Sequence, residues 1–432
     1  MSQRRWALAA AIGLLAISAP ALVGCAKGKG EAAAKEISIF LWVRPEELDV
    51  NQRLKAEFER THPGLSVKII NDPASQAMAK LKTLIAGGEA PDVMSLHGAF
   101  FVPLADQGAL EDLGPFVAAD ADVNVSDFYP GLLELCKYNG KLYSLPRYTS
   151  VYALLYNRNT FKAAGEAFPT QGKTWDWPEF VRVARALTKD LDGDGNTDQY
   201  GCAIDFTGAR VYPWVWQNGG ELVTPDRKQV TLDTPEVRGA LQFLVDLKQV
   251  YHVTPSVVQL QNREGIDYFK RQRVAMYQSG PWDVQELKSI KDFEWDVAPL
   301  PKGKKAATLL GDENYAISSR SQHKQEAWEL LKFLLSADSQ RRMALDLGKM
   351  PSRRSVAEKE FLQSDPSHDL RVFVDAIGYA VIPPNLPDWE EIGTAFNGEL
   401  ELMWAGSVSV AQGCRDTQEK INGILARHLQ GL

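Results

Sequence analysis

Four aspartates crowd one short stretch of the chain, and their spacing resembles that of a metal-binding loop. Asp190, Asp192, Asp194 and Asp198 lie within LTKDLDGDGNTDQYG, residues 187–201. Counted from Asp190, they occupy positions 1, 3, 5 and 9 of an EF-hand-type loop, and a glycine stands at position 6. Oxygen ligands at this spacing fold around one Ca²⁺, so the pattern predicts a structural calcium site.

Two other interpretations of this loop stay open. Position 12 of the calcium pattern is normally a bidentate Glu, and here it is Gly201. A solvated turn of Asp and Gly residues is therefore the alternative to a calcium site. A catalytic acid/base pair is disfavoured, because adjacent exposed carboxylates lack the burial that raises one pKa for general acid catalysis.

The bulk composition indicates a large soluble protein without a nucleic-acid partner. The chain has 432 residues, 45% hydrophobic and 24% charged, which allows two or three domains. Its formal net charge of −7 argues against nucleic-acid binding, which usually needs a basic face. Beyond the N-terminal segment, Cys136, Cys202 and Cys414 show no metal-ligand spacing. In an oxidising compartment one pair could bridge, but we predict that all three are core residues.

The N-terminus predicts an exported, lipid-anchored protein. Two arginines are followed by an apolar run that ends in Leu-Val-Gly-Cys, which resembles a bacterial lipobox. We predict a signal peptide over residues 1–24, lipid modification of Cys25 and a flexible spacer over residues 25–36. The body would then lie outside the cytoplasm. An uncleaved N-terminal anchor helix is the alternative.

The elements that must position any site read as an α/β fold. Strands are predicted at 36–43, 65–70 and 92–96, and helices at 51–64 and from 75 to the glycine pair at 87–88. This alternation indicates a parallel sheet covered by helices. Further helices are predicted at 177–190, 235–250 and 322–340, and the segment from 352 onward is mainly helical.

Six phrases, taken in order from about residue 37 to 350, carry a family resemblance. They are PDVMSLHGAFFVPLADQGALEDL, YSLPRYTSVYALLYNRNTFKAAG, TWDWPEFVRVARALTKDLDGDGNTDQYG, WQNGG, VAMYQSGPWDVQELK and AISSRSQHKQEAWELLKFL. Together they resemble the extracellular solute-binding proteins of ATP-binding-cassette (ABC) importers, in the family that takes sugars and oligosaccharides. The acidic loop resembles a calcium-loop-like turn found at this place in that family.

The resemblance implies the two-lobed fold of type II periplasmic binding proteins, with discontinuous α/β lobes joined by hinge crossings. We predict that lobe 1 comprises residues 37–148 and 273–312, and lobe 2 residues 149–272 and 313–432. The crossings would lie at 148–150 and near 311–312.

A carbohydrate site needs flat aromatic rings for the C–H faces of sugars and planar polar groups for their hydroxyls. Trp42 and Arg44 follow the first strand and His97 follows the third, at the edge where ligands of open α/β sheets bind. The other predicted ligand-binding residues, in order, are Arg147, Tyr148, Thr149, Trp216, Asn218, Gly280, Trp282, Asp283, Asp312, Glu313 and Trp389.

The implied function is a carrier without chemistry and without a cofactor, apart from the calcium of the acidic loop. We expect a monomer that captures a mono- or oligosaccharide between its lobes and delivers it to a membrane permease. A carrier of glycerol phosphate, polyamine or another solute is the first alternative. A secreted glycoside-acting enzyme, using for example Asp283 and Glu313, is the second, and a calcium-dependent adhesion module is the third.

Overall fold

The structure is a computed structural model that describes residues 34–72, 74–169, 174–256 and 265–431. The predicted signal peptide, the lipidation site Cys25 and most of the spacer lie outside the described residues. In the part of the chain that is described, no helix is both long and apolar enough to cross a membrane.

The first lobe is built on a five-stranded sheet with the strand order β2-β1-β3-β11-β6. Its strands are β1 (Lys35–Leu41), β2 (Leu65–Asn71), β3 (Val93–His97), β6 (Ser144–Ser150) and β11 (Gly311–Ile317). The first three are parallel, as predicted, and β11 runs antiparallel to both of its neighbours. The helices of this lobe are α1 (Pro45–Thr61), α2 (Ala74–Ala86), α3 (Gly98–Asp106), α4 (Gly114–Ala119), α5 (Pro130–Leu135), α13 (Lys324–Leu334) and α14 (Ala337–Leu347).

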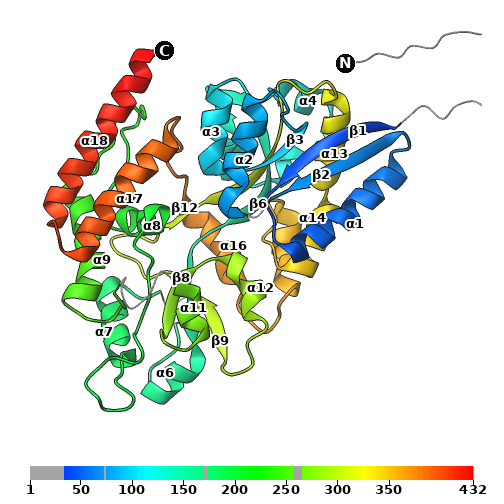
Figure 1. Cartoon of the computed structure of the whole chain (residues 1–432). Coiled ribbons are helices and arrows are strands. Elements are labelled where there is room, and N and C mark those ends of the chain that lie inside the picture. The colour runs from blue at the N-terminus through cyan, green and yellow to red at the C-terminus, as the bar shows by residue number, and fades with distance from the viewer. Residues whose placement is uncertain (1–33, 73, 170–173, 257–264, 432) are drawn as a thin grey trace, which may run out of the picture.

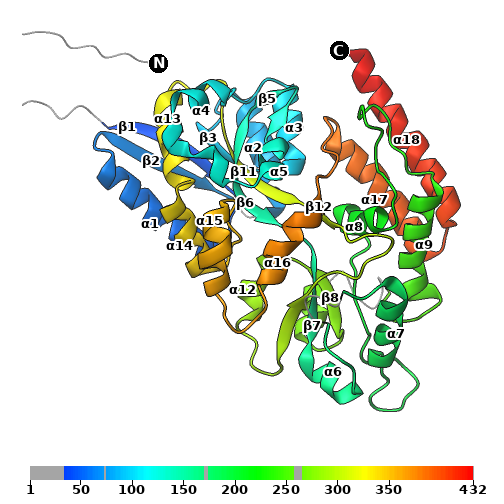
Figure 2. The same ribbon diagram turned by 180° about the vertical axis from the view of Figure 1, so that it is seen from behind.

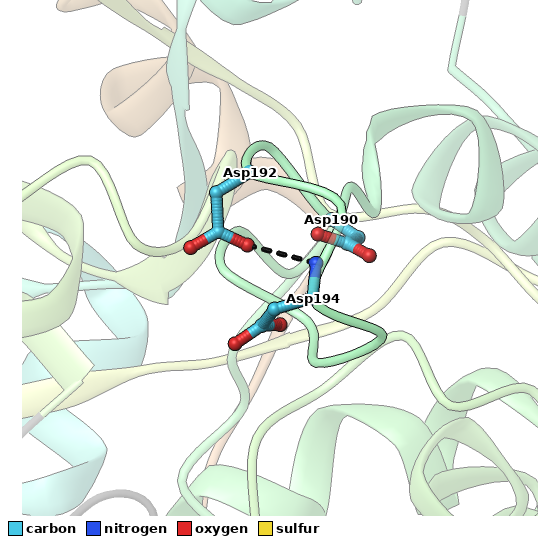
Figure 3. Close-up of side chains that lie close together, drawn as sticks. All are labelled: Asp190, Asp192 and Asp194. Atoms are coloured by element: carbon cyan, nitrogen blue, oxygen red, sulfur yellow. Dashed lines mark hydrogen bonds between the residues drawn. The ribbon is translucent and has the colours of Figure 1, made fainter.

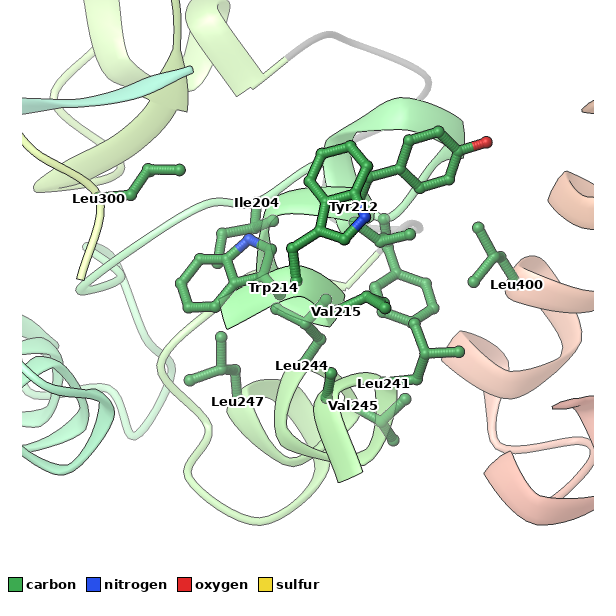
Figure 4. Packing of buried hydrophobic residues seen from close by; sticks show 14 of the residues in the cluster. Ile204, Tyr212, Trp214, Val215, Leu241, Leu244, Val245, Leu247, Leu300 and Leu400 are labelled. Atoms are coloured by element: carbon green, nitrogen blue, oxygen red, sulfur yellow. The ribbon is translucent and has the colours of Figure 1, made fainter. Parts of the chain in front are cut away.

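The second lobe contains a three-stranded antiparallel sheet with the order β8-β7-β9. Its strands are β7 (Ala153–Asn157), β8 (Met276–Ser279) and β9 (Trp295–Ala298). Its helices are α6 (Arg158–Ala164), α7 (Trp177–Leu187), α8 (Gly208–Gln217), α9 (Pro235–Gln249), α11 (Gly265–Lys270) and α12 (Val284–Leu287). Figure 4 shows its main core, in which α8 packs against α9 and against Leu400.

The last eighty residues run along both lobes. They form α15 (Arg354–Val356), the π-helical turn η4 (Ala357–Phe361), α16 (Arg371–Ala376), α17 (Trp389–Ala405) and α18 (Val410–Gly431). The pair α17–α18 is a helical hairpin on the second lobe, seen in orange and red in Figures 1 and 2. Two short paired strands, β10 (Thr308–Leu309) and β12 (Ala380–Val381), lie at the junction of the lobes, and β4 (Lys137–Tyr138) pairs with β5 (Lys141–Leu142).

The predicted two-lobed α/β fold is confirmed, but the division of the chain differs in two places. Strands β8 and β9 pair with β7, so residues 273–300 belong to the second lobe and not to the first. Strand β11 lies between β3 and β6, and α13 and α14 pack on the core of the first lobe. Residues 313–347 therefore belong to the first lobe. Strand pairing decides to which lobe a segment belongs, and the hydrophobic pattern of a strand carries no information about the strand with which it pairs.

The structure also tests the predicted helix over 322–340 and the predicted burial of the cysteines. The helix predicted over 322–340 is two helices, because Ser336 caps the N-terminus of α14 by accepting a hydrogen bond from the backbone N–H of Ser339. The three cysteines that the structure describes, Cys136, Cys202 and Cys414, are buried and unbridged, as core residues should be.

Candidate ligand-binding site

A cavity of about 1200 Å³ lies between the two lobes. The first lobe supplies the carboxyl ends of β1, β3 and β6 and the N-terminal turns of α1 and α3, the edge at which ligands of open α/β sheets bind. The second lobe supplies the turn η3 (Pro281–Asp283), the start of α8 and the start of α17. The size exceeds that of a typical drug-sized site, so the cavity accommodates a ligand larger than one sugar ring.

Three tryptophans line the cavity, and each lies edge-on to a second aromatic ring. The ring centroids are 6.3 Å apart for Trp42 and His97, 5.5 Å for Trp282 and Tyr152, and 6.5 Å for Trp389 and Tyr212, with interplanar angles of 72°, 89° and 78°. Edge-to-face packing restricts the rotation of each indole ring. The cavity therefore presents flat apolar faces that are ordered before a ligand arrives.

Gly280 determines where the Trp282 indole lies. A Cβ atom at position 280 would lie 2.1 Å from Cζ3 and 2.4 Å from Cη2 of that ring. The φ of Gly280 is −146°, which any residue adopts, so the ring and not the backbone requires glycine here. The predicted turn that presents Trp282 is thus present, although Gly280 itself does not line the cavity.

A buried ionic network lies under the first-lobe wall. Arg147 donates from Nη2 to Oε1 of Glu47 at 2.6 Å, and its Nη1 lies 3.5 Å from Oε2 of Glu313. Lys349 Nζ lies 3.0 Å from the other oxygen of Glu47. Burial opposes the ionisation of Glu47, but the two cations outweigh it and hold the pKa of its carboxyl below the usual range. The guanidinium of Arg147 also stacks 4.4 Å from the ring of Tyr148.

A β-bulge places Arg147 in that network. Strand β11 pairs Glu313 with Tyr148 and the next residue, Asn314, with Pro146, which leaves Arg147 as the extra residue of β6. A bulge re-aims side chains and is frequent beside binding sites. Arg147 is buried and does not line the cavity, so the prediction that it contacts the ligand directly is wrong. It instead holds Glu47 and Tyr148, and these two residues line the cavity.

Asp312 is a buried carboxyl at the cavity wall without a cationic partner among the described residues. Its Oδ2 accepts a hydrogen bond from Asn314 Nδ2 at 2.5 Å, and Glu313 adds a like charge. Burial, aided by that like charge, raises the pKa of Asp312 to about 7. His97, although exposed to the cavity, is surrounded by enough protein that desolvation lowers its pKa, so its ring is neutral at pH 7.

This environment of Asp312 predicts a pH dependence of stability. The carboxyl has a pKa near 3.9 in the unfolded chain and about 7 in the folded protein. The folded state therefore holds a proton that the unfolded state has lost, and the stabilisation that is full below pH 4 disappears as the pH rises through 7. In Asp312→Asn, the free energy of unfolding relative to wild type should rise between pH 5 and pH 8 by on the order of 3 kcal/mol.

Urea denaturation of both proteins at the two pH values measures this difference. Asp283 also titrates in the window, because burial raises its pKa to about 6, but it is present in both proteins and cancels. A constant difference between the two proteins across the pH range would contradict the assignment.

Nine of the predicted site residues line the cavity together. They are Trp42, Arg44, His97, Tyr148, Thr149, Trp282, Asp312, Glu313 and Trp389. Arg44 also lies 3.8 Å from Glu286 of α12, so this ion pair joins the two lobes at the edge of the cavity.

Three further predictions are corrected by the packing. Trp216 is buried in the core of the second lobe, 2% exposed, one helical turn beyond Tyr212. The two lie on the same face of α8, and the cavity lining ends at Tyr212 in that helix. Asn218 donates to the carbonyl of Glu236, and Asp283 is buried with its carboxylate accepting from Ser279 Oγ. None of these three lines the cavity.

The cavity also includes residues that sequence reasoning missed. The principal ones are Tyr152 and Tyr212, the amides Asn71, Asn385 and Asn397, and the charged residues Glu47 and Lys349. Only Tyr152 and Tyr212 had a signal, since Tyr152 lies within a phrase that carries the family resemblance and Tyr212 lies four residues before the start of another. The others come from segments without a motif.

The acidic loop lies in the second lobe, and none of its residues lines the cavity. One carboxylate oxygen each from Asp190, Asp192 and Asp194 lies within 4.8 Å of the others. Figure 3 shows the three side chains close together on the loop. Their oxygens also accept backbone hydrogen bonds, for example from Gly195 N to Asp190 at 2.9 Å. Asp198 is not in this group, because it pairs with Arg273 at 3.1 Å.

The two lobes and the aromatic cavity between them define a ligand-binding protein of the hinged, two-lobed class. A sequence profile of the bacterial extracellular solute-binding proteins matches residues 46–341, more than half of the chain, and the protein belongs to that family.

Two solved structures and one curated relative are similar to this chain. A binding protein of Listeria monocytogenes in complex with cycloalternan is 24% identical, with a TM-score of 0.83 over 91% of this chain and 99% of the other. A solute-binding protein of Thermotoga lettingae bound to α-D-tagatose is 26% identical, with a TM-score of 0.78 over 91% and 100% of the two chains. The galactooligosaccharide-binding protein of Bacillus subtilis is 22% identical over 410 residues, 92% of both chains.

Proposed function

We propose that the protein captures a carbohydrate in the cavity between its lobes and delivers it to the permease of an ABC importer. The observation that carries this proposal is the set of three tryptophan faces, each fixed by a perpendicular ring, in one interlobe cavity. Flat indole faces suit the C–H faces of sugar rings, and the surrounding amides and carboxylates suit hydroxyls. Three similar proteins bind sugars or oligosaccharides according to their names.

A thermal-shift screen against neutral mono- and oligosaccharides tests this function. A ligand at 100 times its dissociation constant adds about 2.7 kcal/mol to the stability of the folded protein, which is readily measured. The panel should also contain glycerol 3-phosphate and spermidine. A response to either of these with no response to any sugar would assign the protein to another class of solute.

The same samples decide between a carrier and an enzyme. The family consists of solute-binding proteins, and Asp283, one of the two carboxylates considered for glycoside hydrolysis, is buried away from the cavity. We infer that the bound sugar is released from the protein with all of its covalent bonds intact. Chromatography of a bound oligosaccharide after long incubation should recover it intact, and release of shorter sugars would favour the enzyme.

We propose further that Cys25 carries the lipid that holds the protein at the outer side of the membrane. The lipobox-like sequence before Cys25 supports this anchor, and the family is extracellular. Cys25→Ala should move the protein from the membrane fraction to the soluble fraction. Retention of the variant in membranes would instead support an uncleaved anchor helix.

Asp190, Asp192 and Asp194 are proposed to hold a structural Ca²⁺. Three carboxylates this close repel one another, and oxygen donors are the ligands that Ca²⁺ prefers. Millimolar Ca²⁺ should raise the melting temperature of the wild type but not of Asp192→Asn, and it should not change sugar affinity. An identical melting temperature with Ca²⁺ and with a chelator would leave the loop as a hydrogen-bonded turn.

A further inference from the structure

The loop that leads into α17 has a fixed position on the cavity wall. Its sequence from residue 382 to 388 is IPPNLPD, and the three prolines restrict its backbone. The preceding strand β12 pairs with β10, and Leu310 N donates to the carbonyl of Val381 at 2.9 Å. Within the loop, Leu386 is 3% exposed and packs in the core of the second lobe. Both the loop and its ends are therefore held.

Asn385 lies at the middle of this loop and lines the cavity. Its side chain is half-buried, and the side-chain amide has no hydrogen-bond partner within the described chain, whereas the backbone N–H donates to the carbonyl of Pro383 at 2.9 Å. The other two cavity asparagines are engaged. Asn71 accepts from Val43 N at 3.1 Å and donates to the carbonyl of Val43 at 3.2 Å, and Asn397 accepts from Gly208 N at 2.7 Å. Asn385 thus keeps both its donor and its acceptor for a ligand.

The chemistry of a held amide suits the reading of hydroxyl orientation. An amide offers an acceptor oxygen and two N–H donors in one plane, so it can accept from one hydroxyl and donate to its neighbour. Trp389, four residues further along, provides a flat face in the same wall of the cavity. Sugar epimers differ at one ring carbon, where the hydroxyl and the hydrogen exchange directions, so the rest of each ring is the same. A rigidly placed amide forms its hydrogen bonds with one direction and is left unpaired by the other.

We propose that Asn385 is a specificity-determining residue, which selects among epimers by hydrogen bonding the hydroxyls of a sugar ring seated against Trp389. This inference rests on the proposed carbohydrate-binding function and adds to it the residue that chooses the sugar.

Dissociation constants for three epimer pairs test the proposal on the purified full-length protein. The pairs are D-glucose with D-mannose, which differ at the 2-hydroxyl, and cellobiose with lactose and isomaltose with melibiose, which differ at one 4-hydroxyl. Wild type should prefer one member of the best-bound pair. Asn385→Ala should weaken that member at least roughly tenfold and its epimer much less, so that the preference ratio falls toward one. Asn385→Asp, which keeps the shape but loses the donor, should also lower the ratio.

Asn71→Ala is the matched control, because it removes an amide from the same cavity that serves the backbone of Val43. It should weaken both members of a pair by the same factor and leave the ratio unchanged. An Asn385→Ala ratio equal to that of wild type, whether affinity falls or not, would overturn the inference and leave carbohydrate binding intact. Binding of none of the six sugars by the wild type would count against the proposed function and the inference together, and a melting curve for each variant shows that it is folded.

Discussion

Replacing Trp282 with alanine should remove most of the affinity for the sugar while leaving the unliganded fold nearly as stable as wild type. The indole lines the cavity, lies on the Cα of Gly280 and is only partly buried. A tryptophan at the centre of a binding site commonly contributes at least 2 kcal/mol, so the dissociation constant should rise at least roughly 30-fold. Loss of this partly buried ring at the cavity surface should cost about 1 kcal/mol of stability or less.

Isothermal titration with the best sugar of the screen and urea denaturation of the free protein measure the two effects. Trp175→Ala is the matched control, because Trp175 is also half-buried but stacks on Phe161 outside the cavity. It should leave the affinity unchanged. If Trp282→Ala lowers stability strongly and retains affinity, Trp282 is a packing residue and the cavity assignment fails.

Replacing Arg147 with alanine should be among the most destabilising changes in the protein. Its side chain is 2% exposed, it pairs with Glu47, and it stacks on two tyrosine rings. Removal leaves the buried Glu47 carboxylate with Lys349 as its remaining cation. Breaking a buried ion pair on one side costs about 3–5 kcal/mol, because the charge left behind has lost its compensation.

The midpoint of urea unfolding measures this cost, and Arg182→Ala provides the comparison. Arg182 also forms two carboxylate pairs, with Glu166 and Glu179, but its side chain is 54% exposed. Exposed pairs contribute about 0–1 kcal/mol, since water and salt screen them. Equal losses of unfolding free energy in the two variants would contradict this prediction, because they would show that the ion pair under the cavity wall contributes no more than an exposed one. Sugar affinity of the folded Arg147→Ala protein should fall as well, because Glu47 and Tyr148 line the cavity.

Three aromatic residues of the site, Trp42, His97 and Trp282, were predictable because the local sequence around each determines its position. Trp42 follows β1 and His97 ends β3, two strands that their apolar residues make visible, and the carboxyl ends of parallel strands meet at one edge of a sheet. Trp282 follows a glycine and a proline that form a turn whatever lies around them. Its presence at the cavity therefore needed only the correct fold.

Trp216 and Asn385 show why other residues could not be assigned. Trp216 lies four residues after Tyr212, and both pack in the core of the second lobe, yet only Tyr212 also lines the cavity, because the cavity lining ends at Tyr212 in α8. In the sequence, Asn385 cannot be told from any other loop asparagine. Only the structure shows that the side chains of Asn71 and Asn397, the other two cavity asparagines, are hydrogen bonded to the backbone. Exposure and hydrogen-bond partners depend on segments distant in the chain, such as Gly208 for Asn397, 189 residues away.

By itself the sequence determined the family, the two-lobed α/β class, the first three parallel strands with their helices and the aromatic character of the site. These features follow from periodicity, turn residues and residue type, which act over a few neighbouring positions. Only the tertiary structure decided to which lobe β8, β9 and β11 belong and which tryptophans line the cavity. It also showed that Arg147 is buried beneath the cavity wall, where it pairs with Glu47. Strand pairing, burial and ion pairing join residues distant in the chain, and no local pattern specifies the partner.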